Sequence, residues 1–205
     1  IADGNATYKL DMRTTLGSND TINGVDHDSA DWSSLFQAGE TVVFECVVAN
    51  SEWIVVNDGR IPCSARIHRD DTAGAQSIPD STLTKVQCTE SLYNRGMTVD
   101  TTTNYSITAR RAGVYSTSGL IATNTSALVS TENFLCCLYY EGTRVNTAAA
   151  VKNGGSSYID ASFSDTLEMS AGEKVELYCF QGAGVNIDLA ALAVIPNFIH
   201  LTEII

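Results

Sequence analysis

The densest group of side chains that could bind a cation is an acidic segment near the N-terminus, Asp26-His27-Asp28-Ser29-Ala30-Asp31. Closely spaced carboxylates such as those of Asp26, Asp28 and Asp31 supply the oxygen ligands that Ca²⁺ prefers. The glycine and the distal glutamate of an EF-hand loop are absent, so a solvated loop is the alternative interpretation. We expect Ca²⁺ as the metal that these aspartates could bind, and Asp70-Asp71 is a similar candidate site. No other cofactor is expected.

The chain has three histidines and six cysteines, but they form neither a catalytic nor a zinc-binding pattern. His27, His68 and His200 lie far apart and in different local settings. No CxxC pair is present to coordinate zinc, and no GxSxG motif marks an activated serine. A nucleophile needs a base and an orienting group close by, so the sequence indicates a protein that is not an enzyme.

The cysteines suit the interior of strands instead. Cys46, Cys88 and Cys179 lie in β-prone segments, where a reduced thiol behaves as a small hydrophobic group. A chain of 205 residues can bury a core of its own, so a disulfide framework is not needed. Cys136 and Cys137 are adjacent, and neighbouring residues of a strand point to opposite faces, so at most one of them can face the core.

Composition argues against two classes of function. The net charge is −12, and a chain without clustered Lys and Arg is a poor partner for nucleic acid. No apolar stretch reaches the length of a membrane span. Hydrophobic residues make up 44% of the chain and charged residues only 18%, and Ser, Thr, Asn and Gly fill the difference. This balance is typical of β-strands and turns.

Short segments with period-two alternation, separated by turn residues, predict an all-β protein. No amphipathic helix with capping residues is evident. Residues 186–195 fit either a strand or one or two helical turns, because Pro196 ends the segment. The expected strands are 41–48, 52–56, 64–69, 83–88, 105–109, 113–122, 134–140, 144–151, 158–169, 174–181 and 198–205.

The order of motifs in the second part of the chain resembles the C1q-like globular domain. Ser64-Ala65-Arg66-Ile67 looks like the first strand of that family, and Leu83-Thr84-Lys85-Val86 looks like its second strand region. Ala112-Gly113-Val114-Tyr115 is similar to the P-G-x-Y entry into the central strand, and residues 167–177 are similar to L-x-L-x-x-G-D-x-V-x-L. The resemblance implies a C1q/TNF-like jelly-roll sandwich over residues 61–205.

The first part of the chain resembles a small β module of bacteriophage tail-fibre and other virion proteins. Thr21-Ile22-Asn23-Gly24 matches its T-I-x-G turn, and Gly39-Glu40-Thr41-Val42 matches its G-E-x-V strand. Trp53-Ile54-Val55 matches its W-x-V strand. Residues 1–60 are therefore expected to form this small module.

The resemblance to the C1q/TNF-like fold implies a homotrimer, and the residues add a physical reason. The strands carry more aromatic and aliphatic residues than the two inner faces of a sandwich need. Outward apolar residues would be exposed in a monomer, whereas packing around a threefold axis buries them. Coverage by loops is the alternative. The expected interface residues are Tyr115, Phe134, Tyr139, Tyr140, Tyr178 and Phe180.

These features predict a non-catalytic structural or adhesive protein on the surface of a bacteriophage particle, as a capsid decoration, head fibre or tail-fibre tip. The expected partners are sister chains, other virion proteins and a host surface glycan or receptor. A secreted C1q-like recognition module and a microbial extracellular filament subunit are the alternatives. Oxidised cysteines, or glycans on the sequons at Asn5, Asn19, Asn104 and Asn124, would favour the secreted module.

Overall fold

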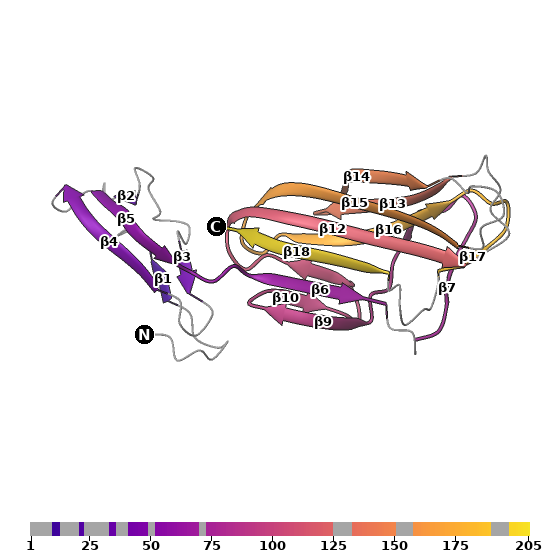
Figure 1. The fold of residues 1–205 in the computed structure, drawn as a ribbon, viewed down its shortest axis with the longest axis horizontal. Coiled ribbons are helices and arrows are strands. Elements are labelled where there is room, and N and C mark those ends of the chain that lie inside the picture. The colour runs from indigo at the N-terminus through magenta and orange to yellow at the C-terminus, as the bar shows by residue number, and fades with distance from the viewer. Residues whose placement is uncertain are drawn as a thin grey trace. The chain divides into compact units, whose positions relative to one another are not determined.

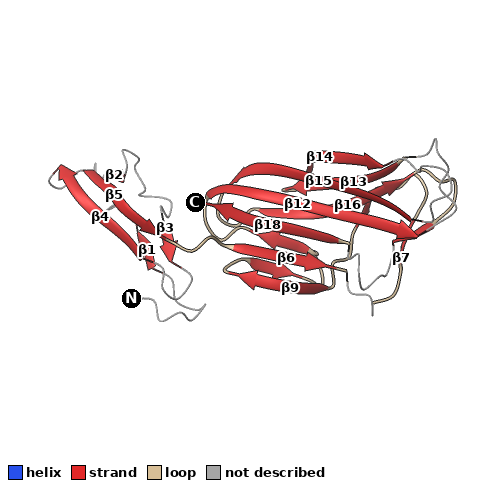
Figure 2. Ribbon diagram, viewed as in Figure 1, coloured by secondary structure: helices blue, strands red, loops and turns tan. Residues whose placement is uncertain are grey.

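The computed structural model describes residues 10–12, 21–22, 33–35, 41–48, 52–69, 73–124, 133–150, 158–189 and 197–205. Every regular element in these ranges is a β-strand (Figure 2). The same ranges contain no helix that is long and apolar enough to cross a membrane. The chain divides into two compact units, Ile1–Pro62 together with Ile205, and Cys63–Ile204.

The first unit contains a hairpin of two long strands. β4 (Thr41–Val48) pairs antiparallel with β5 (Glu52–Gly59), which confirms both strands expected there, the second being longer than predicted. β2 (Thr21–Ile22) pairs in parallel with the start of β5. β1 (Leu10–Met12) and β3 (Ser33–Leu35) form a separate antiparallel pair.

The second unit is a sandwich of two antiparallel sheets (Figure 1). The seven-stranded sheet has the order β7-β17-β12-β18-β6-β9, and β15 pairs with the other side of β12. Its strands are β6 (Ser64–His68), β7 (Gln76–Ile78), β9 (Glu90–Arg95), β12 (Gly113–Asn124), β15 (Tyr158–Met169), β17 (Ile187–Leu189) and β18 (Phe198–Ile204).

The six-stranded sheet has the order β10-β11-β16-β13-β14, and β8 also pairs with β16. Its strands are β8 (Thr84–Lys85), β10 (Thr98–Asp100), β11 (Ser106–Thr108), β13 (Phe134–Tyr140), β14 (Thr143–Ala150) and β16 (Lys174–Gln181). The strands β7, β9 and β10 were not predicted. β17 shows that the start of the segment left open at 186–195 is a strand.

The core lies between the two sheets and follows the period-two alternation of the strands. In β16, Val175, Leu177 and Cys179 are fully buried, whereas Tyr178 and Phe180 are half-buried on the opposite face, as the sequence predicts. The largest fully buried side chains come from both sheets: Tyr115, Phe134, Ile67, Ile78, Ile107, Ile121, Leu138, Met169, Leu177, Leu189 and Ile199.

The hairpin of β13 and β14 turns through Glu141 and Gly142. Their φ angles are +47° and +75°. Positive φ at both central residues is what a type I′ turn requires, and the twist of that turn matches the twist of the strands it joins. The turn therefore fixes the pairing of the two strands locally.

Gly119 of β12 is the place where a side chain from β15 fills the space between the sheets. Phe163 is the cross-strand partner of Gly119. A Cβ atom built on Gly119 would stand 2.5 Å from the Phe163 ring and 3.3 Å from Leu177 of the opposite sheet. The first distance is too short for two carbon atoms, so only glycine leaves room for the ring.

We expect Gly119→Ala to lower the free energy of unfolding by about 1–3 kcal/mol, because the new methyl group displaces the Phe163 ring. Gly182→Ala is the matched control, since a Cβ atom there meets nothing within 4 Å; it should change stability by less than about 0.5 kcal/mol. Urea unfolding followed by circular dichroism measures both. Equal effects of the two substitutions would contradict this account of Gly119.

Candidate assembly surface

The outward face of the seven-stranded sheet brings together residues from five strands, in the order β15-β12-β18-β6-β9 (Figure 1). The cross-strand register aligns Ser164, Ser118, His200, Arg66 and Tyr93 in one row from β15 to β9. These positions alternate with buried ones along β6, β12, β15 and β18, so they point away from the core.

Four residues of this face, Arg66, Tyr93, Phe198 and His200, form a basic and aromatic group, here called the Arg66 cluster. The Arg66 guanidinium lies 3.7 Å from the centroid of the Phe198 ring, which is a cation–π contact. The rings of Tyr93 and His200 meet edge to face, with centroids 6.0 Å apart. The Nε atom of Arg66 is buried and has no hydrogen-bond partner in the described part of the chain. The rings thus hold Arg66 in place without neutralising its charge.

Apolar side chains flank the Arg66 cluster toward both ends of the strands. Val114 of β12 and Ile204 of β18 are cross-strand partners, and they are 43% and 51% exposed. At the other end, Leu120 is paired with Phe198, and both are half-buried. Exposed apolar groups gathered on one face of a protein mark a site of protein–protein interaction.

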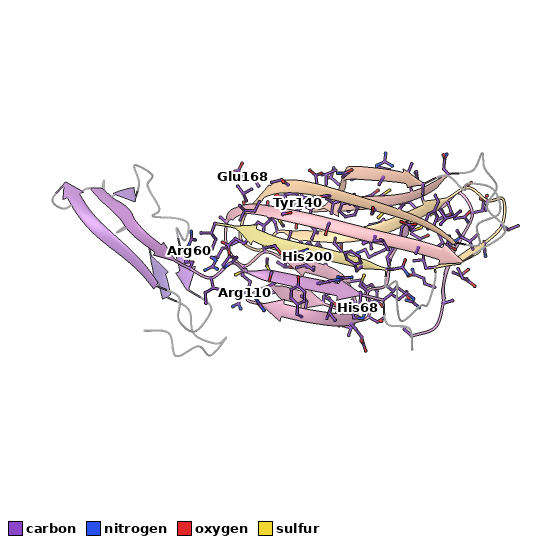
Figure 3. The ribbon with its side chains drawn as sticks, viewed as in Figure 1. Arg60, His68, Arg110, Tyr140, Glu168 and His200 are labelled. Atoms are coloured by element: carbon purple, nitrogen blue, oxygen red, sulfur yellow. The ribbon has the colours of Figure 1, made fainter. Side chains whose placement is uncertain are left out.

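The charges on this face are separated by strand. β15 directs Asp160 and Glu168 outward, and both are exposed. β6 and β9 carry Arg66 and Arg95 at outward positions. Figure 3 labels Glu168 of β15, and it labels His200 and His68 of the neighbouring strands β18 and β6. The face is therefore acidic along β15, whereas β6 and β9 carry the two arginines and one carboxylate, that of Glu90, which lies beside His68.

Inside the sandwich, an ion pair fixes the strand that carries His200. Arg111 and Glu203 are 2% and 3% exposed, and Arg111 Nη2 lies 3.0 Å from Glu203 Oε2. The same oxygen accepts a hydrogen bond from the backbone N–H of Cys63 at 3.0 Å. The hydroxyl of Tyr115 donates to the backbone carbonyl of Arg111 at 2.9 Å. These bonds attach the end of β18 to the residue that precedes β6.

The outward face of the six-stranded sheet carries a second aromatic group. The rings of Tyr139 and Tyr178 have centroids 4.2 Å apart, and the ammonium group of Lys85 lies 5.5 Å from the Tyr178 centroid. Lys85 Nζ also lies 2.6 Å from Glu176 Oε1, and the Glu176 side chain is only 5% exposed. Phe180 is half-buried on the same face. These side chains already cover one another within the chain.

The residues expected at a subunit interface fall into two groups. Tyr115 and Phe134 are fully buried in the core, so the argument that they need a partner chain to cover them was wrong. Strand parity separates two faces, but it does not say which face is inward. Tyr139, Tyr178 and Phe180 do lie on an outward face. The hydroxyl of Tyr140 donates a hydrogen bond to the Glu173 carboxylate, which raises the pKa of Tyr140 to about 12.

The five described cysteines, Cys63, Cys88, Cys136, Cys137 and Cys179, are fully buried, as expected for Cys88 and Cys179, and the last four of them are free thiols. Cys136 faces the core opposite Cys179. Cys137 points to the other face, where it pairs with Tyr178 and Thr147 and is covered there. Both adjacent cysteines are therefore buried although only one faces the core. Cys46 lies among residues whose side chains are not described.

The expected Ca²⁺ ligands Asp26, Asp28 and Asp31 lie outside the described residues, as do Asp70 and Asp71. Within the described ranges, no group of three or more His, Cys, Asp or Glu side chains could hold a metal ion. His68 and His200 take part in contacts of the sheet face: His68 Nε2 lies 3.7 Å from Glu90 Oε2, and His200 belongs to the Arg66 cluster.

Sequence reasoning missed the Arg66 cluster. The alternation of Phe198, His200 and Thr202 against Ile199 and Leu201 was available as a signal that β18 has one aromatic and polar face. The partners of that face come from β6 and β9, which are more than 100 residues away along the chain, and no local pattern identifies them.

We expect acid to destabilise the fold through His200. Burial lowers the pKa of His200, and the nearby positive charge of Arg66 lowers it further. Below the ordinary histidine value of about 6.5, the unfolded chain therefore binds more protons than the folded chain, and the free energy of unfolding falls as pH decreases. Urea titrations between about pH 7.5 and 5 should show this decline, and His200→Gln should reduce it. An unchanged decline in the variant would exclude His200 as its source.

No protein-family model and no curated protein matches the sequence. Among solved structures, the Eiger TNF from S. frugiperda superposes with a TM-score of 0.53 at 15% identity, over 71% of this chain and 94% of that chain. Murine APRIL at pH 8.0 gives a TM-score of 0.50 at 12% identity, over 70% and 100%. The globular domain of zebrafish complement 1qA protein gives 0.45 at 12% identity, over 70% and 96%. At such identities the likeness establishes the fold alone: the sandwich is a jelly roll of the C1q/TNF-like kind.

Proposed function

We propose that the chain is a non-catalytic structural and recognition protein that assembles as a homotrimer through the outward face of the seven-stranded sheet. The observation that carries this proposal is the exposed apolar rim of that face, formed by Val114, Ile204 and Tyr93, the last of which is 38% exposed. A partner chain that covers these side chains removes apolar surface from water. The jelly-roll fold supports the threefold assembly that the C1q/TNF-like resemblance implies.

The aromatic group on the six-stranded sheet is the competing interface, since that sheet contains four of the interface residues expected from the sequence, Tyr139, Tyr140, Tyr178 and Phe180. Two observations favour the seven-stranded sheet over it. The aromatic rings of the six-stranded sheet are covered in part by each other and by Lys85. None of these four residues belongs to the most exposed large apolar side chains, whereas Val114, Ile204 and Tyr93 do.

Light scattering of purified protein tests the trimer and its interface together. We expect a mass of three times 21.9 kDa for the wild type. Leu120→Glu, at an outward position of the seven-stranded sheet, should yield the monomer, because it places a charge in the covered apolar surface. Phe180→Glu is the matched change on the six-stranded sheet and should leave the trimer intact. The opposite pattern would assign the interface to the six-stranded sheet, and a wild-type monomer would refute the assembly.

For the biological setting, we propose the surface of a bacteriophage particle. The division of the chain into two units supports this, because the first unit carries the virion-type motifs and can attach the assembly to other virion proteins. The free thiols of Cys88, Cys136, Cys137 and Cys179 support it as well, since reduced cysteines suit assembly inside a reducing cell. The loops of the jelly roll would then bind a host glycan or receptor. The alternatives are a secreted recognition module and an extracellular filament subunit.

Thiol chemistry separates the virion proposal from the secreted alternative. We expect the native protein, isolated from its source without reductant, to show the thiols of Cys88, Cys136, Cys137 and Cys179 only after denaturation, because all four are buried. Addition of reductant should leave the thermal midpoint unchanged. Disulfide-linked peptides in the native protein, or a glycan on Asn104, would instead favour the secreted module.

A further inference from the structure

The charged residues on the outward face of the seven-stranded sheet are distributed unevenly across its strands. Asp160 and Glu168 occupy its β15 side, and Arg66 and Arg95 occupy its β6 and β9 side, where the carboxylate of Glu90 lies 3.7 Å from His68. The outward residues of β12 between them, Val114, Ser116, Ser118 and Leu120, are uncharged. Opposite charges thus lie on the two halves of one surface, separated by a neutral strip.

No described residue forms an ion pair with any of these four charged groups. Among the described residues, the ion pairs are those of His68 with Glu90, Lys85 and Lys174 with Glu176, and Arg111 with Glu203. None of them includes the four charged groups of the two halves. The buried Nε of Arg66 also lacks an acceptor in the described part of the chain. A carboxylate from outside the chain would pair with the charge of the Arg66 guanidinium.

A second copy of this chain offers carboxylates of this kind. In a closed threefold ring every contact is heterologous, so one half of the face meets the other half on the next copy. Each copy has a net charge of −12, so association is opposed by repulsion unless the contact itself pairs opposite charges. The acidic half along β15 and the basic half along β6 and β9 meet this requirement.

We propose that the ring closes by charge complementarity between these halves: the β15 carboxylates of one copy contact the Arg66 side of the next copy. The inference rests on the homotrimer proposed above and names the groups that direct it. The exposed apolar side chains supply affinity, whereas the charges select the orientation and oppose stacking of like halves. A face-to-face dimer would also pair opposite halves, so the oligomeric state is part of the test.

Sedimentation equilibrium of the full chain tests this with charge reversals on each half. Asp160→Lys with Glu168→Lys reverses the acidic half at exposed positions, where no packing is lost, and Arg66→Glu with Arg95→Glu reverses the basic half. Each double variant should weaken the trimer at least about tenfold at low salt, because like charges then face each other. A chain with all four substitutions should recover the trimer. Arg144→Glu, exposed on β14 of the other sheet, is the control and should have no effect.

The outcomes separate the charge proposal from the proposed assembly. A wild-type trimer that both double variants retain would overturn charge-directed closure and leave the trimer standing. Dissociation of the Asp160→Lys, Glu168→Lys chain without recovery in the four-substitution chain would also overturn it, provided that circular dichroism shows both to be folded. A wild-type dimer or monomer would overturn the ring itself.

Discussion

The buried ion pair of Arg111 and Glu203 is the interaction on which the outer surface depends. A carboxylate can occupy the interior of the sandwich only when a cation and hydrogen-bond donors compensate its charge. Arg111 and the backbone N–H of Cys63 do this, and they place Glu203 inward at the end of β18. Since neighbouring residues of a strand face opposite sides, a shift of one residue would bury His200 and expose Ile199. The buried ion pair therefore fixes which residues of β18 point outward.

The outward face of the seven-stranded sheet combines an ordered arginine on one side with exposed carboxylates on the other. Arg66 is stacked on an aromatic ring, which orders its side chain without neutralising it. The entropy of ordering this side chain is thus lost on folding and need not be lost again on association. From Asp160 to Glu168, the outward residues of β15 are polar or acidic and none is aromatic. The side chain of Arg66 is therefore already ordered, and the carboxylates of β15 are exposed. This arrangement favours contact between the β6 half of one copy and the β15 half of another.

Much of the sandwich could be predicted from local alternation, because in each long strand the inward residues are mostly apolar and alternate with the outward ones. The strands at 134–140, 158–169 and 174–181 are confirmed with their bounds. β9 was missed because all six of its residues are exposed, so no apolar period marks it. The inward placement of Tyr115 and Phe134 depends on which sheet packs against which, and the separation of charge depends on the strand order β15-β12-β18-β6-β9. Both are non-local properties that no window of sequence contains.

The tight turn through Glu141 and Gly142 has a consequence for how the chain reaches this structure. Most strand pairs of the sandwich join distant segments; β6, for example, pairs with β18. Closing such long loops is slow, since their entropy is lost before the contacts form. The β13–β14 hairpin is an exception, because its turn brings adjacent strands together within a few residues. Folding is therefore expected to start at this hairpin and to be limited by the late pairing of β18, so that during synthesis the sandwich stays open until β18 has left the ribosome.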